Sequence, residues 1–526
     1  MEGKIKTAFF PKLSGTEGFI LKSEVLTRNQ KIILWFLVLL TLGIKVYLIP
    51  FNMMDMGDSA TRVWNALWWA QKPFFVLPES GNPGWFYFMG PLEMLTKEIY
   101  YTPILTMIVL MTIAGIYIFK TTLILSDYRT ALIAFAIFIL NPVIFRLNFE
   151  PYAQQQYLTA VTIIIYYYIK AFGSANSKKY FIIAGIFSFI ALFSRPEAIF
   201  ILIPLCLLAF LSRKDGCCHF IALALGFQII WMVVSFVVYH TPFKTFQAAD
   251  QYTETANIQG LNLGLRLKGF FLPYYFLVLG LSIFIFYYFI KGTIYLYKKF
   301  PKAILIILFI PILIPALVNG AAGMKAVVYH TTGYMYLMYY YSPVLAAIGL
   351  SLSLDKFRSP FLKTAFTSVV ILSSIPLSYI KEYVPEKYNH LFPKIIEFIV
   401  TTEEPSESEK LIKFIDENIG SYPALIFDTE QSSSSIFYIP YRTKLAPPEK
   451  ILISGYNIPK DRDELIPVIK AFMKKNPKGI IMVKKSGTLM NQIFSELTSA
   501  KPYKRNDLQK IQETDKWIIY TYEINN

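Results

Sequence analysis

The chain has 526 residues, of which 55% are hydrophobic and 17% aromatic, and its mean hydropathy is +0.44. These values lie outside the range of soluble globular proteins and indicate a protein that crosses a membrane many times. The net charge of +16 does not favour nucleic-acid binding, because the basic residues are spread over short loops between apolar runs.

The first apolar run, residues 32–50, follows a polar and basic N-terminal segment. It starts too late for a secretory signal and lacks a small-residue cleavage site, so we expect an uncleaved anchor. Further runs of spanning length follow, and together they predict about eleven transmembrane helices. These runs lie near residues 103–125, 129–147, 155–171, 180–194, 197–212, 219–239, 270–292, 302–320, 334–353 and 362–380.

Basic residues gather in every second loop, on the same predicted side as the N-terminus. Because basic loops stay in the cytoplasm, we expect the N-terminus inside and, with an odd number of spans, the C-terminus outside. The sequence thus predicts a multi-pass protein of the plasma membrane. Its outward-facing loops would be residues 51–102, 146–154, 240–269 and 321–333.

The composition changes after the last apolar run, which divides the chain into a transmembrane module, 1–384, and a soluble segment, 385–526. Strand-like and helix-like patterns alternate in this segment and predict a small extracytoplasmic α/β domain. Such a domain would either position a polymeric or protein acceptor or only cap the outer loops. The predicted strands are 424–428, 436–439, 479–484 and 516–523, and the predicted helices are 408–418, 463–475 and 488–498.

The first predicted outer loop, 51–102, opens with two acids and an arginine: Asp55, Asp58 and Arg62. Asp58 can cap a helix that starts at the next residue, and Arg62 would then share its helix face, so a structural ion pair is an alternative to chemistry. Residues 60–70 and 91–100 have the pattern of amphipathic helices that lie along the membrane surface. A turn followed by aromatics is expected between them.

Polar residues also gather at the predicted outer ends of other spans. Charged groups at bilayer depth are costly unless they are paired or functional, so we expect several of these to converge on one pocket. Arg195 has an alternative role as a snorkelling interface residue, His330 as a hydrogen-bonded loop residue, and the tyrosines from Tyr334 to Tyr341 as an aromatic belt. The clusters are Arg146, Asn148 and Glu150; Arg195-Pro196-Glu197; His240, Lys244, Asp250 and Glu254; and Lys325, His330 and Tyr334.

Five segments in this order resemble motifs of the membrane-embedded glycosyltransferases of the C superfamily. The likeness is to the branch of dolichyl-phosphate-mannose protein mannosyltransferases and aminoarabinose transferases, and it covers roughly residues 30–350. Two positions depart from the family pattern, with Ser59 in place of the usual Glu and Tyr334 in place of the usual Arg. The segments are Gly57-Asp58-Ser59-Ala60-Thr61-Arg62, Phe88-Met89-Gly90-Pro91-Leu92, Asn141-Pro142 with Arg146, Phe193-Ser194-Arg195-Pro196-Glu197, and Gly333-Tyr334-Met335-Tyr336 with Ser342-Pro343.

The resemblance implies a glycosyltransferase that moves a sugar from a polyprenyl-phosphate donor to a hydroxyl of a lipid, glycan or protein at the outer membrane face. It implies that Asp58 is the general base, that fixed cations stabilise the leaving phosphate, and that the anomeric configuration inverts. The substrate-binding residues expected on this basis are Asp55, Arg62, Arg195, Glu197, Lys325, His330 and Tyr334.

Asp55 and Asp58 are also candidate ligands of a divalent cation, but an Asp-x-x-Asp pair alone is poor evidence for a metal. Two other functions stay open. A membrane transporter or lipid flippase would also use many spans and internal charges, although the sequence shows no repeated halves. A polysaccharide polymerase or ligase would share the lipid-linked donor and differ in moving whole glycans.

Overall fold

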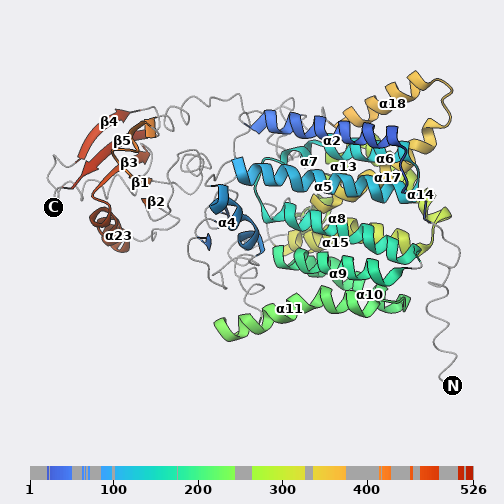
Figure 1. Ribbon diagram of the computed structural model, residues 1–526, viewed down its shortest axis with the longest axis horizontal. Coiled ribbons are helices and arrows are strands. Elements are labelled where there is room, and N and C mark those ends of the chain that lie inside the picture. The colour runs from blue at the N-terminus through green and yellow to red at the C-terminus, as the bar shows by residue number, and fades with distance from the viewer. Residues whose placement is uncertain are drawn as a thin grey trace. The chain divides into compact units, whose positions relative to one another are not determined.

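The computed structural model describes a helical bundle and a small β-sheet (Figure 1). The described residues are 21–22, 24–49, 62–63, 66, 69–70, 84–96, 101–174, 176–242, 263–325, 336–374, 414–415, 417–427, 450–453, 462–484, 508–513 and 517–524. The boundary predicted at residues 384 and 385 lies outside them and stays a prediction, as do the helix 488–498 and the strand 436–439.

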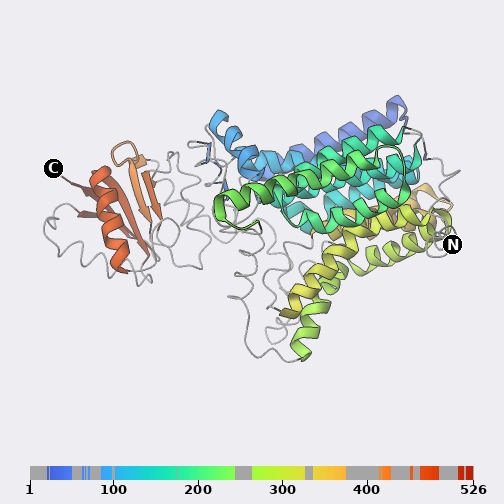
Figure 2. The same cartoon turned by 90° about the horizontal axis from the view of Figure 1, so that it is seen from below.

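Most of the helices overlap the predicted apolar runs, although several begin or end seven or eight residues away from the predicted limits (Figure 2). The helices of the bundle are α2 (Arg28–Leu48), α4 (Gly84–Thr96), α5 (Tyr101–Leu125), α6 (Tyr128–Leu140), α7 (Pro142–Arg146), α8 (Ala153–Gly173), α9 (Ser177–Ser194), α10 (Ala198–Ser212), α11 (Cys217–Tyr239), α13 (Leu263–Leu281), α14 (Ile283–Lys299), α15 (Lys302–Lys325), α17 (Tyr336–Leu354) and α18 (Pro360–Leu372). Among the described residues, five helices are long and apolar enough to cross a membrane, namely α2, α5, α9, α11 and α17. By length and composition, the chain therefore has the helices of a membrane protein.

Two predicted spans are each divided in the structure. The run near 129–147 is broken at Asn141 into α6 and α7, and the run near 270–292 is broken at Ser282 between α13 and α14. Ser282 has a positive φ of 75°, and its hydroxyl caps α14 by accepting a hydrogen bond from the Ile285 amide. Hydropathy does not report such breaks, because the residues on both sides stay apolar.

Two further predictions were wrong in detail. The second amphipathic helix of the first loop begins at Gly84 rather than at Pro91, so the aromatics expected between the two helices lie inside α4. The tyrosines Tyr339, Tyr340 and Tyr341 are fully buried in the bundle instead of forming an aromatic belt. They are held inside by hydrogen bonds, such as that from the Tyr341 hydroxyl to the Val161 carbonyl, at 3.3 Å.

The first helix of the bundle, α2, is fixed to its neighbour α6 at one end. The Tyr128 hydroxyl at the start of α6 donates to the Gln30 carbonyl at 2.9 Å. A capping box between Thr27 and Gln30 defines the start of α2. Only a narrow stripe of α2 faces the bundle, through the buried residues Leu34, Val38 and Lys45, while many of its large apolar side chains are exposed where a bilayer would contact them.

Helices α14 and α17 cross closely where two glycines meet. A Cβ atom on Gly349 would lie against the Tyr288 carbonyl oxygen and the Gly292 amide, and one on Gly292 would lie against the Leu345 carbonyl oxygen. Small residues at such positions allow helix backbones to approach closely in a membrane.

Replacing Gly349 with alanine is expected to push α14 and α17 apart and to lower the melting temperature of the purified protein. The neighbours are backbone atoms that cannot move aside, so the cost should be at least that of ordinary overpacking, about 1–3 kcal/mol. Gly226→Ala on α11 is the matched control, because nothing lies within 4 Å of a Cβ at that position. Equal melting temperatures of the two variants would contradict the close crossing.

The C-terminal part contains a mixed five-stranded sheet with strand order β2-β1-β3-β5-β4. Its strands are β1 (Ala424–Phe427), β2 (Ile451–Ile453), β3 (Lys478–Lys484), β4 (Leu508–Glu513) and β5 (Trp517–Glu523), with one long helix, α23 (Arg462–Lys475). β1 pairs in parallel with β2 and β3, and β5 pairs antiparallel with β3 and β4. Strands β1, β3 and β5 and helix α23 match predicted elements, whereas β2 and β4 were missed because they are short or polar.

A glycine makes room for an aromatic ring in this sheet. Gly479 on β3 faces Tyr522 on β5, and a Cβ on Gly479 would overlap the Tyr522 ring. Tyr522 is fully buried with the apolar residues between the sheet and α23, and this burial raises the pKa of its phenol well above the ordinary value. The sheet therefore has its own small hydrophobic core.

Candidate functional site

Asn141 positions the first charged cluster at one end of the bundle. Its backbone turns the chain between α6 and α7, and its side-chain oxygen accepts a hydrogen bond from the Ile144 amide at 3.2 Å. Its amide nitrogen donates to the Gly280 carbonyl near the end of α13 at 2.7 Å. This residue is fully buried, so both bonds form away from water and fix the direction of α7.

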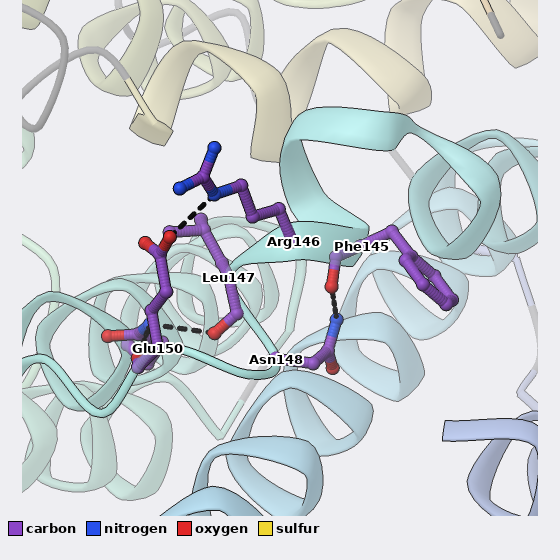
Figure 3. Close-up of polar contacts among 6 residues, drawn as sticks. Phe145, Arg146, Leu147, Asn148 and Glu150 are labelled. Atoms are coloured by element: carbon purple, nitrogen blue, oxygen red, sulfur yellow. Dashed lines mark hydrogen bonds and ion pairs between the residues drawn. The ribbon is translucent and has the colours of Figure 1, made fainter. Parts of the chain in front are cut away.

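The helix α7 ends at Arg146, and the Arg146 side chain pairs with the carboxylate of Glu150, four residues further along the chain. The Arg146 Nε atom lies 2.6 Å from Glu150 Oε1 (Figure 3). Gln155, in the first turn of α8, donates to the carbonyls of Leu147 and Glu150 at 2.7 and 2.5 Å. The Asn148 side chain also stabilises the turn, because it donates hydrogen bonds to the carbonyls of Ile144 and Phe145. The ion pair is therefore held on a rigid turn.

A second ion pair lies between α9 and α10. The Arg195 guanidinium forms a two-point contact with Glu197, with Nη2 to Oε1 at 2.9 Å and Nε to Oε2 at 3.1 Å. The Arg195 side chain is only 11% exposed. A snorkelling arginine would extend its charged end into water, so the burial and the pairing favour a built site over that alternative.

Two tyrosines, one buried and one partly buried, lie close enough to these ion pairs to feel their charges. The phenol of Tyr157, in the second turn of α8, lies in the electrostatic field of Glu197 and Arg195. The phenol of Tyr336, at the start of α17, lies in that of Glu150 and Arg146. The structure thus brings two charged segments, distant in sequence, to the same end of α8.

Gly84, the first residue of α4, also lies at this end of the bundle. A Cβ on Gly84 would overlap the backbone carbonyl of Phe193, two residues before Arg195. A glycine is therefore required where the start of α4 meets the end of α9. This contact places one edge of the first predicted loop beside the second ion pair.

The remaining predicted site residues are described only in part. Arg62 and Val63 are helical, and Val63 and Ala66, two of the apolar residues of the predicted amphipathic helix, are buried, as is Trp69. Lys325 is the last residue of α15. The predicted residues Asp55, Asp58, His330 and Tyr334 lie outside the described residues, so the proposed base and the candidate cation ligands stay predictions. Within the described ranges, no three His, Cys, Asp or Glu residues gather as metal ligands.

Sequence reasoning missed three residues of this end of the bundle. Gln155 and Tyr157 lie in an apolar helix, where a run of three glutamines was the available signal. Lys45 is the third: its residue is 1% exposed, and it lies near the last turn of α2. A single charge inside an otherwise apolar first span was the signal there.

Comparison with known proteins identifies the fold. ArnT from Cupriavidus metallidurans bound to undecaprenyl phosphate aligns with a TM-score of 0.62 over 94% of this chain and 98% of that chain, at 9% sequence identity. The same protein in the apo state gives a TM-score of 0.56 over 93% and 98%, at 10% identity. No protein-family model and no curated protein sequence matches the chain.

A third structure, the archaeal oligosaccharyltransferase AglB from Archaeoglobus fulgidus with an inhibitory peptide and a dolichol-phosphate, aligns at a TM-score of 0.45 and 12% identity. It covers 85% of this chain and 69% of that chain. The two ArnT alignments carry the comparison. The chain therefore has the fold of ArnT, as the resemblance of its motifs led us to expect.

Proposed function

We propose that this protein is a glycosyltransferase that takes a sugar from a polyprenyl-phosphate donor and transfers it to a hydroxyl acceptor. The observation that carries the proposal is a fold shared over nearly the whole chain with ArnT, a protein crystallised with undecaprenyl phosphate. The two arginine-containing ion pairs at one end of the bundle support it, since fixed cations suit a phosphate leaving group.

The proposed chemistry is a direct displacement at the anomeric carbon. The acceptor oxygen forms a bond to that carbon while its proton passes to the carboxylate of Asp58. The bond between the anomeric carbon and the phosphate oxygen breaks, and its electron pair stays on the polyprenyl phosphate. The sugar therefore inverts its configuration, and no nucleotide is consumed.

The other predicted residues receive supporting roles in this proposal. Arg195, Arg62 and Lys325 stabilise the charge that grows on the leaving phosphate, and Glu197 holds the Arg195 guanidinium in place by its two-point contact. Asp55, His330 and Tyr334 steer the donor or the acceptor. The site faces the extracytoplasmic side of the plasma membrane, which has lipid-linked sugars but no nucleotide sugars.

A transfer assay with the purified protein in lipid nanodiscs tests this function. We expect a labelled sugar to move from a polyprenyl-phosphate sugar to an acceptor, with release of polyprenyl phosphate, and we expect no transfer from the matching nucleotide sugar. Transfer from the nucleotide sugar alone would overturn the proposal. Movement of polyprenyl phosphate between the leaflets of sealed vesicles, without any transfer, would favour the transporter alternative.

A further inference from the structure

Lys45 is a charged residue at membrane depth for which the proposed mechanism has no use. It shares the inward stripe of α2 with Leu34 and Val38, and its residue is 1% exposed. Among the described residues, no hydrogen-bond or ion-pair partner reaches its ammonium group. An ammonium group kept from water is costly, so a residue of this kind indicates a ligand or a function.

Lys45 lies close to the end of α2 that the sequence predicts to face the outer lipid headgroups. The 21 residues of α2 extend about 31 Å, close to the thickness of a hydrocarbon core. Lys45 is three residues from the end of this helix and five from the end of the predicted span 32–50, so its backbone lies about 7 Å inside the outer limit of that span, within reach of a lysine side chain. A snorkelling lysine at that depth would turn outward, whereas this side chain is enclosed by protein.

The packing of α2 places Lys45 at the same end of the bundle as the ion pairs. The hydrogen bond between Tyr128 and Gln30 sets the starts of α6 and α2 at one level, and the two helices pack together. Lys45 lies fifteen residues beyond Gln30, or about 22 Å along the axis. The same rise from Tyr128 leads to the turn of Asn141 and α7, which carries Arg146.

We infer that Lys45 binds the phosphate of the polyprenyl carrier from within the bundle and so positions the donor, an inference that rests on the proposed function. A lipid phosphate supplies the anion that the enclosed ammonium group requires, at the depth where that group lies. The contact is a charge-assisted hydrogen bond from the Nζ atom to a phosphate oxygen. Lys45 thus adds a cation from α2 to the proposed phosphate-binding cations of the other helices.

The test compares three proteins in nanodiscs of zwitterionic lipid, with melting temperature followed against added polyprenyl phosphate or the matching polyprenol. Lys45→Met removes the charge and keeps the length of the side chain, and Lys31→Met, at the exposed opposite end of α2, is the matched control. We expect polyprenyl phosphate to stabilise the wild type and the control. We expect its apparent affinity for Lys45→Met to fall about tenfold or more, with the polyprenol ineffective throughout.

Each other outcome has a distinct meaning. An unchanged affinity of Lys45→Met for polyprenyl phosphate overturns the inference and leaves the proposed function standing. A lower melting temperature of Lys45→Met without lipid, together with an unchanged lipid response, assigns the ammonium group to a carboxylate of the chain itself. A wild-type protein that does not respond to polyprenyl phosphate overturns the proposed function together with the inference.

If Lys45→Met does not fold, chemical dimethylation of lysines in the wild type tests whether Lys45 contacts the lipid phosphate. Polyprenyl phosphate, but not polyprenol, should protect Lys45 from modification as measured by mass spectrometry of its peptide. Lys31 should be modified equally in both cases. Equal modification of Lys45 with the two lipids would overturn the inference.

Discussion

Replacing Asp58 with asparagine is expected to reduce sugar transfer by about two to four orders of magnitude, the usual contribution of a general base. Asparagine keeps the shape of the side chain and can still cap a helix, because its oxygen accepts the same hydrogen bonds. It cannot take the proton of the attacking hydroxyl. The variant should therefore keep its melting temperature and its affinity for polyprenyl phosphate while its kcat falls.

The control for this experiment is Asp215→Asn, an exposed acid in the loop between α10 and α11. This loop lies at the opposite end of α10 from Arg195, and the control should transfer sugar at the wild-type rate. If Asp58→Asn also keeps the wild-type rate, Asp58 is only a helix cap and the base must be another group. A loss of melting temperature together with activity would assign Asp58 a structural role.

Replacing Arg195 with glutamine is expected to lower kcat by about 10²–10³-fold, the usual effect of removing one fixed group that stabilises a developing anion. The guanidinium is buried and held by two contacts to Glu197, so it is already oriented before a donor arrives. Arg195→Lys should recover only part of the rate, because an ammonium group keeps the charge and loses the two-point geometry. Arg129→Gln, at the exposed start of α6, is the matched control.

A double variant separates a role in chemistry from a role in structure. If Arg195 serves only to neutralise Glu197, then Arg195→Gln with Glu197→Gln should restore both melting temperature and transfer. If Arg195 stabilises the leaving phosphate, the double variant should recover melting temperature and stay inactive. Single-turnover rates with saturating donor give the readout, since they report the chemical step rather than lipid binding.

Many of the helices could be predicted because a helix that crosses a membrane consists of a long run of apolar residues. The limits of α5, α9 and α10 agree with their predicted runs to within three residues. The helix breaks at Asn141 and Ser282 could not be predicted from hydropathy. At each break a side chain caps the next helix, and this cap forms only once the chain has turned. The buried tyrosines of α17 were assigned to the membrane interface because tyrosine favours that region, and only packing against α5 and α8 shows them inside.

The candidate site was predictable in its residue types and only partly in its pairing. The segments around Arg146 and Arg195 were expected to converge, and the structure brings both to the start of α8. Only the structure shows that Arg195 pairs with Glu197 across Pro196 and that its side chain is 11% exposed, so that it does not snorkel. The enclosed position of Lys45 was not predicted, because a single lysine near the end of an apolar span is usually an interface residue. Only its surroundings in the structure show otherwise.

The sequence by itself determined that the protein lies in a membrane, where its helices run, and which family its motifs resemble, because hydropathy and local motifs are properties of neighbouring residues. Tertiary structure alone decided which charges are enclosed, which are paired, and which face of each helix turns inward. Those properties depend on contacts between residues far apart in the chain. This distinction is important in a bilayer, because lipid tails cannot stabilise a charge. A charged side chain inside the membrane therefore needs a partner elsewhere in the protein or in a bound ligand.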